Sequence, residues 1–154
     1  IRLENVSKMY GTDTLAVRDA SFDIAKGEFV FLAALGLGED DTVLDVGTGS
    51  GVLAISAVCR GARSAHGTDI NPASLGIVAL NVGFNGVDGR VTVGMEPLDQ
   101  LVGPYSIVVA NILAVVLREL APDLVARVAP GGRLVLAGAL GHQAAGLVAA
   151  VHPL

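Results

Sequence analysis

Two different spacings of apolar positions divide the chain. Near its start, Ala20, Phe22 and Ile24 alternate with polar residues, which is the period of two that a half-buried strand shows. Together with an apolar opening segment and the run Phe29–Leu32, this spacing predicts a small antiparallel β-meander of three strands. The last run also fits the helical stripe of a segment from Glu28 to Leu37, and the strand is our prediction.

From Thr42 onward, short apolar runs alternate with longer segments of helical character. The alternation predicts βαβ units around a parallel sheet, and right-handed crossovers place helices on both of its faces. We therefore predict an α/β fold, a Rossmann-like three-layer sandwich with a mainly parallel sheet, preceded by the meander. The predicted strands are Thr42–Val46, Ser64–Asp69, Arg90–Met95, Ser106–Asn111 and Arg133–Ala137, the predicted helices are Gly51–Arg60, Pro72–Asn85, Leu113–Val128 and His142–Val151, and a turn is predicted at Pro130–Gly132.

Composition narrows the class of protein. The 154 residues suit one ordinary domain, and 10 basic against 15 acidic residues give a net charge of −5, which argues against a binder of nucleic-acid phosphates. With 52% hydrophobic and 16% charged residues, the chain is not of the disordered class. The one cysteine, Cys59, lies in an apolar predicted helix, where we expect it in the core, and it allows no intrachain disulfide.

The sequence also suggests where in the cell the protein lies and whether the chain is part of a longer polypeptide. The longest strongly apolar stretch, Ile107–Leu117, is interrupted by Asn111 and is too short to span a bilayer. We expect a cytoplasmic protein without membrane contact. Because the chain opens with Ile1 instead of methionine, we also expect a piece of a longer or processed polypeptide.

A glycine-rich loop is the most informative segment. Asp45-Val46-Gly47-Thr48-Gly49-Ser50-Gly51 follows an apolar strand and opens a helix. Glycines permit a tight turn and close approach of a ligand, and a helix N-terminus offers free N–H groups. Asp69 ends the next predicted strand, where a carboxylate can accept hydrogen bonds from two ribose hydroxyls. The alternative is that the glycines only shape the turn and Asp69 is a solvated strand end.

The spacing of these glycines separates two kinds of cofactor. A dinucleotide fingerprint, G-x-G-x-x-G, would need glycine where this chain has Val52. The pattern D-x-G-x-G-x-G from Asp45 to Gly51 instead resembles motif I of class I methyltransferases that use S-adenosylmethionine.

Four ordered segments extend that resemblance to the PrmA methyltransferase family over about residues 33–150. They are Thr42–Ile55, Gly67–Pro72, Val108–Ala114 and Pro130–Leu134. The family methylates lysine and N-terminal amines of a large-subunit ribosomal protein, so the resemblance implies a Rossmann-like methyltransferase fold, S-adenosylmethionine as cofactor and a ribosomal protein as substrate.

The resemblance also implies roles for individual residues. Asp45 and the backbone of Gly47–Gly51 would hold the methionyl moiety. Asp69 would hold the ribose, Ile70 would pack on the adenine, and Glu96 would lie near the adenine amine. Asn111 is the candidate catalytic residue, because its side-chain carbonyl can accept a hydrogen bond from the target amine. The alternatives are a strand-end Asn111 that satisfies local backbone and a solvated Glu96 at a helix start. No metal site is predicted, and the candidate cofactor-binding residues are Asp45, Gly47, Thr48, Gly49, Gly51, Asp69, Ile70 and Glu96.

Residues 1–32 resemble a different family, the start of ABC-type ATPases of the FtsE branch. The resemblance rests on Ile1–Tyr10, Ala16–Phe22 and Gly27–Leu32, and implies that Tyr10 matches an adenine-stacking aromatic. The phosphate loop of such enzymes needs a lysine, whereas Ala33–Asp41 has none and ends in three acids. An ATP-binding module is therefore not supported. We expect two segments, residues 1–32 and 33–154, in a possible chimera.

The parts of the PrmA pattern that find no match here bear on activity. The cofactor-closing loop, the docking domain for the ribosomal protein and the last strands of the sheet have no counterpart in the sequence. We therefore expect a truncated methyltransferase domain that binds S-adenosylmethionine and transfers methyl groups poorly, because geometry supplies most of this rate. The alternative is a structural or designed chimera without activity.

Overall fold

The computed structural model describes residues 2–10, 14–23, 36–139 and 143–151. The chain divides into two compact units, Ile1–Leu35 and Gly36–Leu154. In the first unit, β1 (Arg2–Tyr10) pairs antiparallel with β2 (Thr14–Asp23), as predicted for the first two strands of the meander. The third predicted strand, at residues 29–32, lies outside the described residues.

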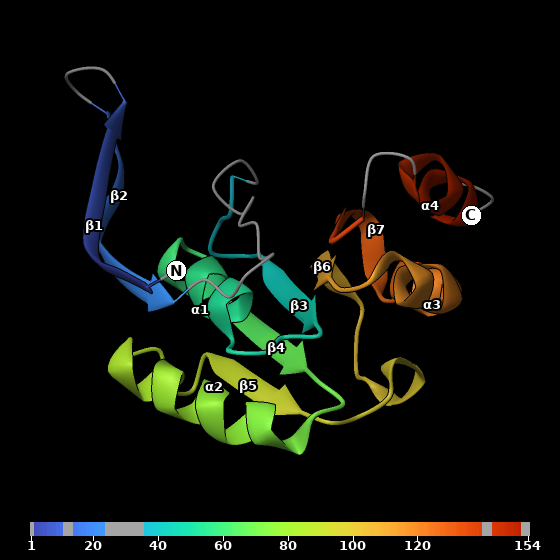
Figure 1. Ribbon diagram of the computed structural model, residues 1–154, viewed down its shortest axis with the longest axis horizontal. Coiled ribbons are helices and arrows are strands. Elements are labelled where there is room, and N and C mark those ends of the chain that lie inside the picture. Colours follow the sequence, from blue (N-terminus) through green and yellow to red (C-terminus); the bar gives the residue numbers. More distant parts are fainter. Residues whose placement is uncertain (1, 11–13, 24–35, 140–142, 152–154) are drawn as a thin grey trace. The chain divides into compact units, whose positions relative to one another are not determined.

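The second unit is built on a parallel sheet of five strands in the order β5-β4-β3-β6-β7 (Figure 1). The sheet and the alternation of strands with helices confirm the predicted fold class. The strands are β3 (Thr42–Val46), β4 (Ser64–Thr68), β5 (Val91–Gly94), β6 (Tyr105–Asn111) and β7 (Val128–Ala137); the helices are α1 (Val52–Cys59), α2 (Pro72–Phe84), α3 (Ala114–Ala126), α4 (Ala144–Val151) and the short 3₁₀ helix η2 (Leu98–Gln100).

The strand order places a reversal in the middle of the sheet. The chain moves outward from β3 to β4 and β5, then returns to the other side of β3 and continues through β6 to β7. Helix α1 packs on β3 and β4, α2 packs on β5, and α3 packs on β7 and on α4. Right-handed crossovers put α1 and α2 on one face and α3 on the other. Ligands of such sheets bind beyond the carboxyl ends of the strands beside the reversal, here β3 and β6.

Alternate residues of the central strands serve the two cores. Leu44 and Val46 of β3 join Val108 of β6 in the core that also contains Leu117 and Leu124 of α3. The intervening residues Val43, Ile107 and Val109 are also buried. Because both faces are covered, these strands consist of continuous apolar runs instead of an alternating pattern. This explains why the sequence predicts them so closely.

Two expectations are wrong in detail. Pro130–Gly132 is not a turn before the last strand but part of β7, which begins at Val128 and shifts its register against β6 between Tyr105 and Ile107. β7 lies at an edge of the five-stranded sheet, where proline and a glycine irregularity are tolerated. Cys59 is exposed instead of buried, because it is the last residue of α1.

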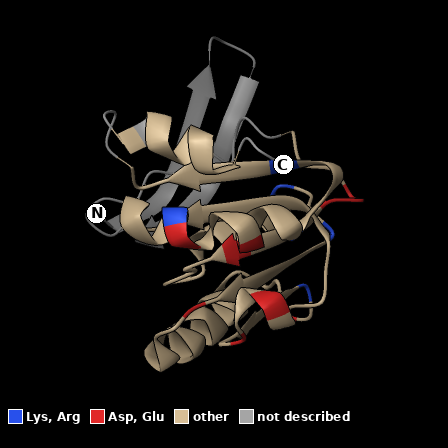
Figure 2. Ribbon diagram, turned by 90° about the vertical axis from the view of Figure 1, so that its right-hand side faces the viewer, with Lys and Arg blue, Asp and Glu red and all other residues tan. Residues whose placement is uncertain are grey.

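Charged side chains are sparse on the described elements. Figure 2 shows acidic and basic positions interspersed along the ribbon, without a long run of basic positions. Within the described ranges, no helix has the length and apolar character needed to cross a membrane.

Candidate functional site

The loop between β3 and α1 requires glycine at several positions. Gly47, Gly49 and Gly51 have φ of 73°, 55° and 81°, in the left-handed region that other residues seldom adopt. Steric contacts also require glycine at two of these positions. A Cβ on Gly47 would collide with the Cγ2 methyl of Ile112, and a Cβ on Gly51 would come within 3.0 Å of Val78.

Hydrogen bonds fix this loop to the end of β4. The amides of Gly47 and Thr48 both donate to the carbonyl of Thr68, at 2.8 and 3.1 Å. The amide of Gly49 donates to Oδ2 of Asp69 at 2.8 Å, and that of Gly51 donates to the carbonyl of Thr48 at 2.8 Å. We expected the loop to present free N–H groups to a ligand. At these residues the amides instead have partners within the protein.

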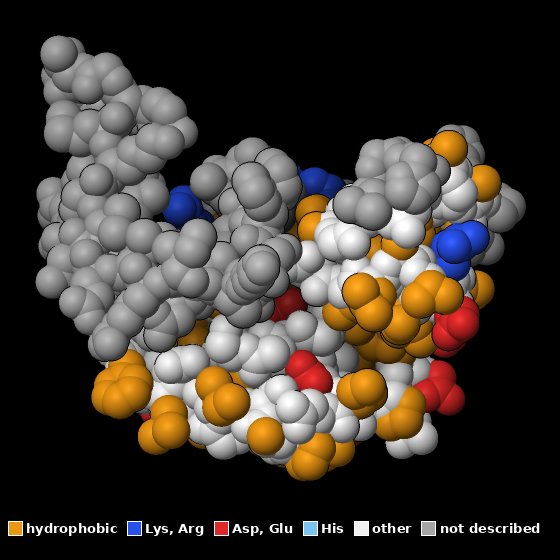
Figure 3. Space-filling view, in the orientation of Figure 1, with side chains coloured by type: hydrophobic (Ala, Val, Ile, Leu, Met, Phe, Trp, Pro, Cys, Tyr) orange, Lys and Arg blue, Asp and Glu red, His pale blue; other side chains and the backbone are white. Residues whose placement is uncertain are grey.

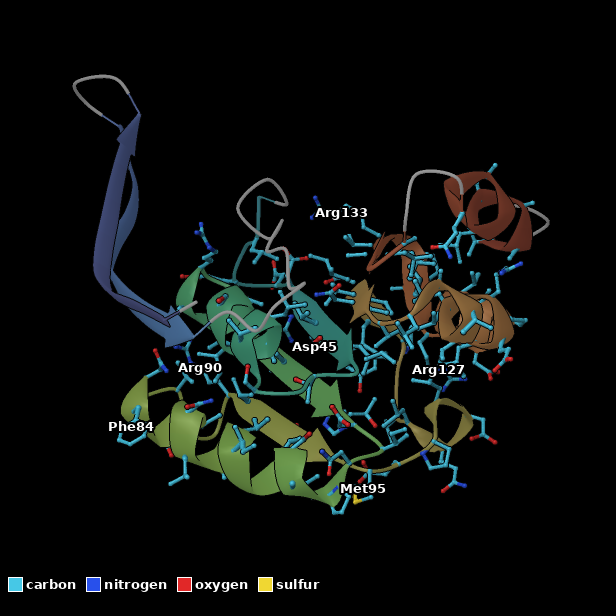
Figure 4. All side chains as sticks on the ribbon, viewed as in Figure 1. Asp45, Phe84, Arg90, Met95, Arg127 and Arg133 are labelled. Carbon is cyan, nitrogen blue, oxygen red and sulfur yellow. The ribbon has the colours of Figure 1, made fainter. Side chains whose placement is uncertain are left out.

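Asp45 and Thr48 brace the loop from within. Asp45 is fully buried, and its Oδ2 accepts from the hydroxyl of Thr48 at 2.7 Å and from the amide of Ala54 in α1 at 3.2 Å. Thr48 is 3% exposed and packs against Gly67 of β4, where a Cβ would lie 2.6 Å from its Oγ1. Figure 4 shows Asp45 in the interior of the unit, at the sheet. These contacts join β3, the loop and α1.

Asp69 connects the loop to the start of α2. Its Oδ2 accepts from Gly49, and its Oδ1 accepts from the amide of Asn71 at 2.9 Å. A carboxylate has about four acceptor positions, so each oxygen can accept one further hydrogen bond. The side chain is half-buried. Next to it, Ile70 is 96% exposed, and Asn71 caps α2 by accepting from Ala73. The edge therefore presents one carboxylate and one apolar side chain.

Glu96 follows β5 and its carboxylate lies back against that strand. It contacts Gly94 and lies 3.8 Å from Nε2 of His66 in β4, while the main-chain carbonyl of Glu96 accepts from the hydroxyl of Thr68 at 3.0 Å. The side chain is therefore directed toward the surface formed by β4 and β5. Its contact with an adenine amine stays a prediction.

Asn111 lies on the other side of the reversal, at the end of β6. The pairing of Val46 with Ala110 puts Asn111 beside Gly47, so the structure brings the candidate catalytic residue to the glycine loop. Asn111 is half-buried. Its Oδ1 lies 3.3 Å from where a Cβ on Gly138 would stand, so the residue after β7 also approaches it.

Sequence reasoning missed several residues that hold this site. Asn81 of α2 donates from Nδ2 to the carbonyl of Ser50 at 2.8 Å, and its place as a polar residue in a nearly apolar helix was the available signal. Gly67, Thr68 and Ile112 lie within segments that carry the family resemblance, but nothing in their chemistry indicated long-range contacts. Among the residues that the structure describes, no cluster of His, Cys, Asp or Glu is arranged to hold a metal ion.

Comparison with known sequences gives a consistent family. The family model "Ribosomal protein L11 methyltransferase (PrmA)" matches residues 31–153. The ribosomal protein L11 methyltransferase of Geobacter sulfurreducens is 48% identical over 112 residues, which are 73% of this chain and 37% of that protein. The corresponding protein of Xanthomonas euvesicatoria pv. vesicatoria is 50% identical, with coverage of 73% and 36%. The chain thus spans little more than a third of the length of these relatives.

Solved structures agree with the sequence relatives. Ribosomal protein L11 methylase from Lactobacillus delbrueckii subsp. bulgaricus superposes with a TM-score of 0.69 at 34% identity, over 76% of this chain and 60% of that one. An RNA methyltransferase from Salinibacter ruber, solved in complex with S-adenosyl-L-homocysteine, gives a TM-score of 0.62 at 25% identity, over 68% of this chain and 70% of that one.

Proposed function

The chain belongs to the ribosomal protein L11 methyltransferase (PrmA) family, and we propose that residues 33–154 bind S-adenosylmethionine at the carboxyl edge of the sheet. The observation that carries the proposal is the carboxylate of Asp69, held by the amides of Gly49 and Asn71 with one acceptor position left on each oxygen. The complex of the Salinibacter ruber enzyme with S-adenosyl-L-homocysteine supports the same class of ligand.

Each end of the ligand has a counterpart at this edge. Asp69 accepts from the ribose hydroxyls, and the exposed side chain of Ile70 packs on the adenine. The Gly47–Gly51 turn takes the methionyl moiety, which is the role that the family resemblance implies for it. Asp45 and Thr48 act from inside the protein by keeping that turn in shape. When bound, the cofactor supplies a methyl group on a sulfonium, which is open to attack by a nucleophile.

Asn111 is the residue that we propose for handling the methyl acceptor. A free lysine amine has a pKa of about 10.4, so it must lose a proton before it can attack. The side-chain carbonyl of Asn111, beside Gly47, accepts a hydrogen bond from the neutral amine and directs its lone pair. Such positioning contributes most of the rate in an in-line displacement.

The acceptor itself is proposed from the family. The relatives are named for ribosomal protein L11, and we propose an amine of that protein as the target. The chain matches little more than a third of each relative, and the expectation of poor transfer drawn from its sequence stays a prediction.

Calorimetric titration with S-adenosylhomocysteine tests the cofactor site. Asp69→Ala removes an acceptor for two hydroxyls, and a hydrogen bond to a charged group contributes about 1.5–3 kcal/mol. We expect an affinity about tenfold to a hundredfold weaker. Gly49→Val should weaken binding further, because a branched side chain at φ 55° is strained and fills space at the loop.

Three controls complete this test. Asp88→Ala removes the same charge at an exposed site and should leave affinity unchanged. Tyr10→Ala should also bind normally, and Mg-ATP should give no heat, since the resemblance of residues 1–32 to ATPases stops before a phosphate loop. If Tyr10→Ala abolishes binding while Asp69→Ala does not, the ligand site is in the other unit.

Transfer is measured separately, with methyl-labelled S-adenosylmethionine and purified ribosomal protein L11. We expect slow incorporation that Asn111→Ala abolishes without changing S-adenosylhomocysteine affinity. Equal incorporation by the Asn111→Ala variant would contradict the role of Asn111. Rapid incorporation by the unchanged chain would contradict the expectation of slow transfer.

A further inference from the structure

Ile112 is the point at which three strand ends meet. A Cβ built on Gly47, after β3, would collide with the Cγ2 methyl of Ile112 and lie 3.8 Å from its Cβ. A Cβ on Gly138, after β7, would collide with the carbonyl of Ile112. Ile112 itself directly follows Asn111, the last residue of β6. One residue thus touches the glycine loop and the end of β7 while adjoining the candidate catalytic residue.

The glycine loop is consequently fixed from two sides. On the β4 side, the amide of Gly47 donates to the carbonyl of Thr68 at 2.8 Å. On the β6 side, the methyl of Ile112 packs where Gly47 has no side chain. The side chain of Ile112 also packs against the core beneath α3, and this packing holds the side chain in place. No hydrogen bond is needed on this second side, because contact alone sets the distance.

Side-chain stiffness suits isoleucine for this purpose. A β-branched residue has a restricted χ1, so the Cγ2 methyl that faces Gly47 keeps its place relative to the main chain of Asn111–Ile112. An unbranched Cβ would lose that methyl even if the volume of the side chain were conserved.

We propose that Ile112 is a positioning residue, whose Cγ2 methyl sets the position of the glycine loop relative to Asn111 and so determines how well the cofactor is held. The inference rests on the proposed cofactor site and adds a residue to it. The feature that matters is the branch at Cβ and not the volume of the side chain.

Two variants separate branch from volume. Ile112→Val keeps both carbons on Cβ, including the methyl against Gly47, and loses one methyl further out. Ile112→Leu keeps every carbon but moves the branch away from Cβ. Ile77→Leu, at a half-exposed position of α2, makes the same isomeric change away from the loop and is the matched control.

Binding and hydrogen exchange are then measured on each variant. We expect Ile112→Val to bind S-adenosylhomocysteine within about twofold of the unchanged chain, and Ile112→Leu about fivefold to twentyfold more weakly. Amide exchange at Gly47 and Thr48, without ligand, should be faster in Ile112→Leu and unchanged in Ile112→Val. The Ile77→Leu control should match the unchanged chain in both measurements.

A side chain that only fills the core would give the opposite order. Ile→Val removes buried volume and Ile→Leu conserves it, so weaker binding by the valine variant than by the leucine variant overturns the inference, as does equal binding by both. If the unchanged chain binds no S-adenosylhomocysteine, the proposed function fails. The positioning role of Ile112 is then tested by amide hydrogen exchange alone. Faster exchange at Gly47 and Thr48 in Ile112→Leu alone then upholds the positioning of the loop, and exchange unaltered from the unchanged chain overturns it.

Discussion

At the scale of single residues, the glycine motif contains two kinds of position. Asp45 and Thr48 are buried and bonded to each other, so they act on a ligand only through the shape of the loop. Asp69 and Ile70 are accessible at the sheet edge, where a ligand can touch them. Substitutions in the first group should therefore lower stability, and substitutions in the second should lower affinity.

Thr48→Val is a direct test of the first group. It removes the hydroxyl that donates to Asp45 at 2.7 Å and leaves a side chain of the same shape. Leaving a buried acceptor without one of its hydrogen bonds should lower the free energy of unfolding by about 1–3 kcal/mol. Urea denaturation measures the change. Thr48→Ser, which keeps the hydroxyl, should lose clearly less, and equal losses would assign the effect to packing.

His66 offers a second residue-scale prediction, based on its protonation. Its Nδ1 lies 2.8 Å from Oγ1 of Thr92, and burial lowers the pKa of the imidazole, while the nearby carboxylate of Glu96 acts in the opposite direction. Because the folded protein favours neutral His66, its contribution to stability is present above the unfolded pKa of about 6.5 and is lost as pH falls below that value.

NMR titration of the His66 ring tests this directly. The measured pKa should lie below 6.5, and Glu96→Gln should lower it further by removing the charge that favours the imidazolium. The variant should leave the peptide fold unchanged by circular dichroism. A pKa that rises in Glu96→Gln would mean that the carboxylate and the ring do not interact as described.

At the scale of elements, α2 combines a packed and an unpacked face. Ser74, Val78 and Val82 form its buried row, whereas Leu80 and Phe84 are 65% and 83% exposed. Figure 3 shows hydrophobic side chains along the α2 side of the molecule, and Figure 4 shows Phe84 at the outer end of the helix. Hydrophobicity alone does not reveal which face is buried, because both are apolar.

Neighbouring substitutions on α2 should therefore differ sharply. Val78→Ala removes carbons from a side chain that is 1% exposed and should lower the free energy of unfolding by about 2 kcal/mol. Leu80→Lys should change it by no more than about 0.5 kcal/mol. Urea denaturation of both variants decides the matter, and a larger loss for Leu80→Lys would mean that the exposed face is covered in solution.

The same scale shows what a sequence can and cannot predict. Strands β3 and β6 were predicted within one residue because helices cover both of their faces and leave continuous apolar runs. The start of β7 was missed, since Pro130–Gly132 has the composition of a turn and only its place at the sheet edge allows it in a strand. The contact of Ile112 with Gly47 depends on the pairing of β3 with β6, which no local pattern encodes.

At the scale of the whole second unit, the carboxyl ends and the amino ends of the parallel strands have different roles. The candidate site lies at the carboxyl edge, while the amino edge carries a polar cluster at the start of β3 and β6. There Ser106 donates to Asp41 at 2.8 Å and accepts from the amide of Thr42 at 2.9 Å, and the amide of Gly38 donates to Asp41 at 2.8 Å. The Gly38 amide and the Ser106 hydroxyl lower the pKa of Asp41.

Ser106→Ala should weaken the fold without weakening the site. Removing the hydroxyl should lower the free energy of unfolding by about 1 kcal/mol at pH 7, with S-adenosylhomocysteine affinity unchanged. Because the pKa of Asp41 is depressed in the folded state, this difference should be present above the unfolded pKa of about 3.9 and shrink as pH falls through the folded value. Denaturation at pH 7 and near pH 3 measures it, and a loss of affinity would contradict the separation of the two edges.

The internal hydrogen bonds of the glycine loop also predict how fast a ligand binds and leaves. Because the amides of Gly47, Thr48 and Gly49 already have partners, the loop reaches its shape when the chain folds and has no ordering step left for the moment a ligand arrives. Association is then limited by the encounter of ligand and protein. The observed binding rate should rise in proportion to ligand concentration, without the plateau that a slow rearrangement would produce. Differences in affinity among variants of the loop should accordingly come from differences in the dissociation rate of the ligand.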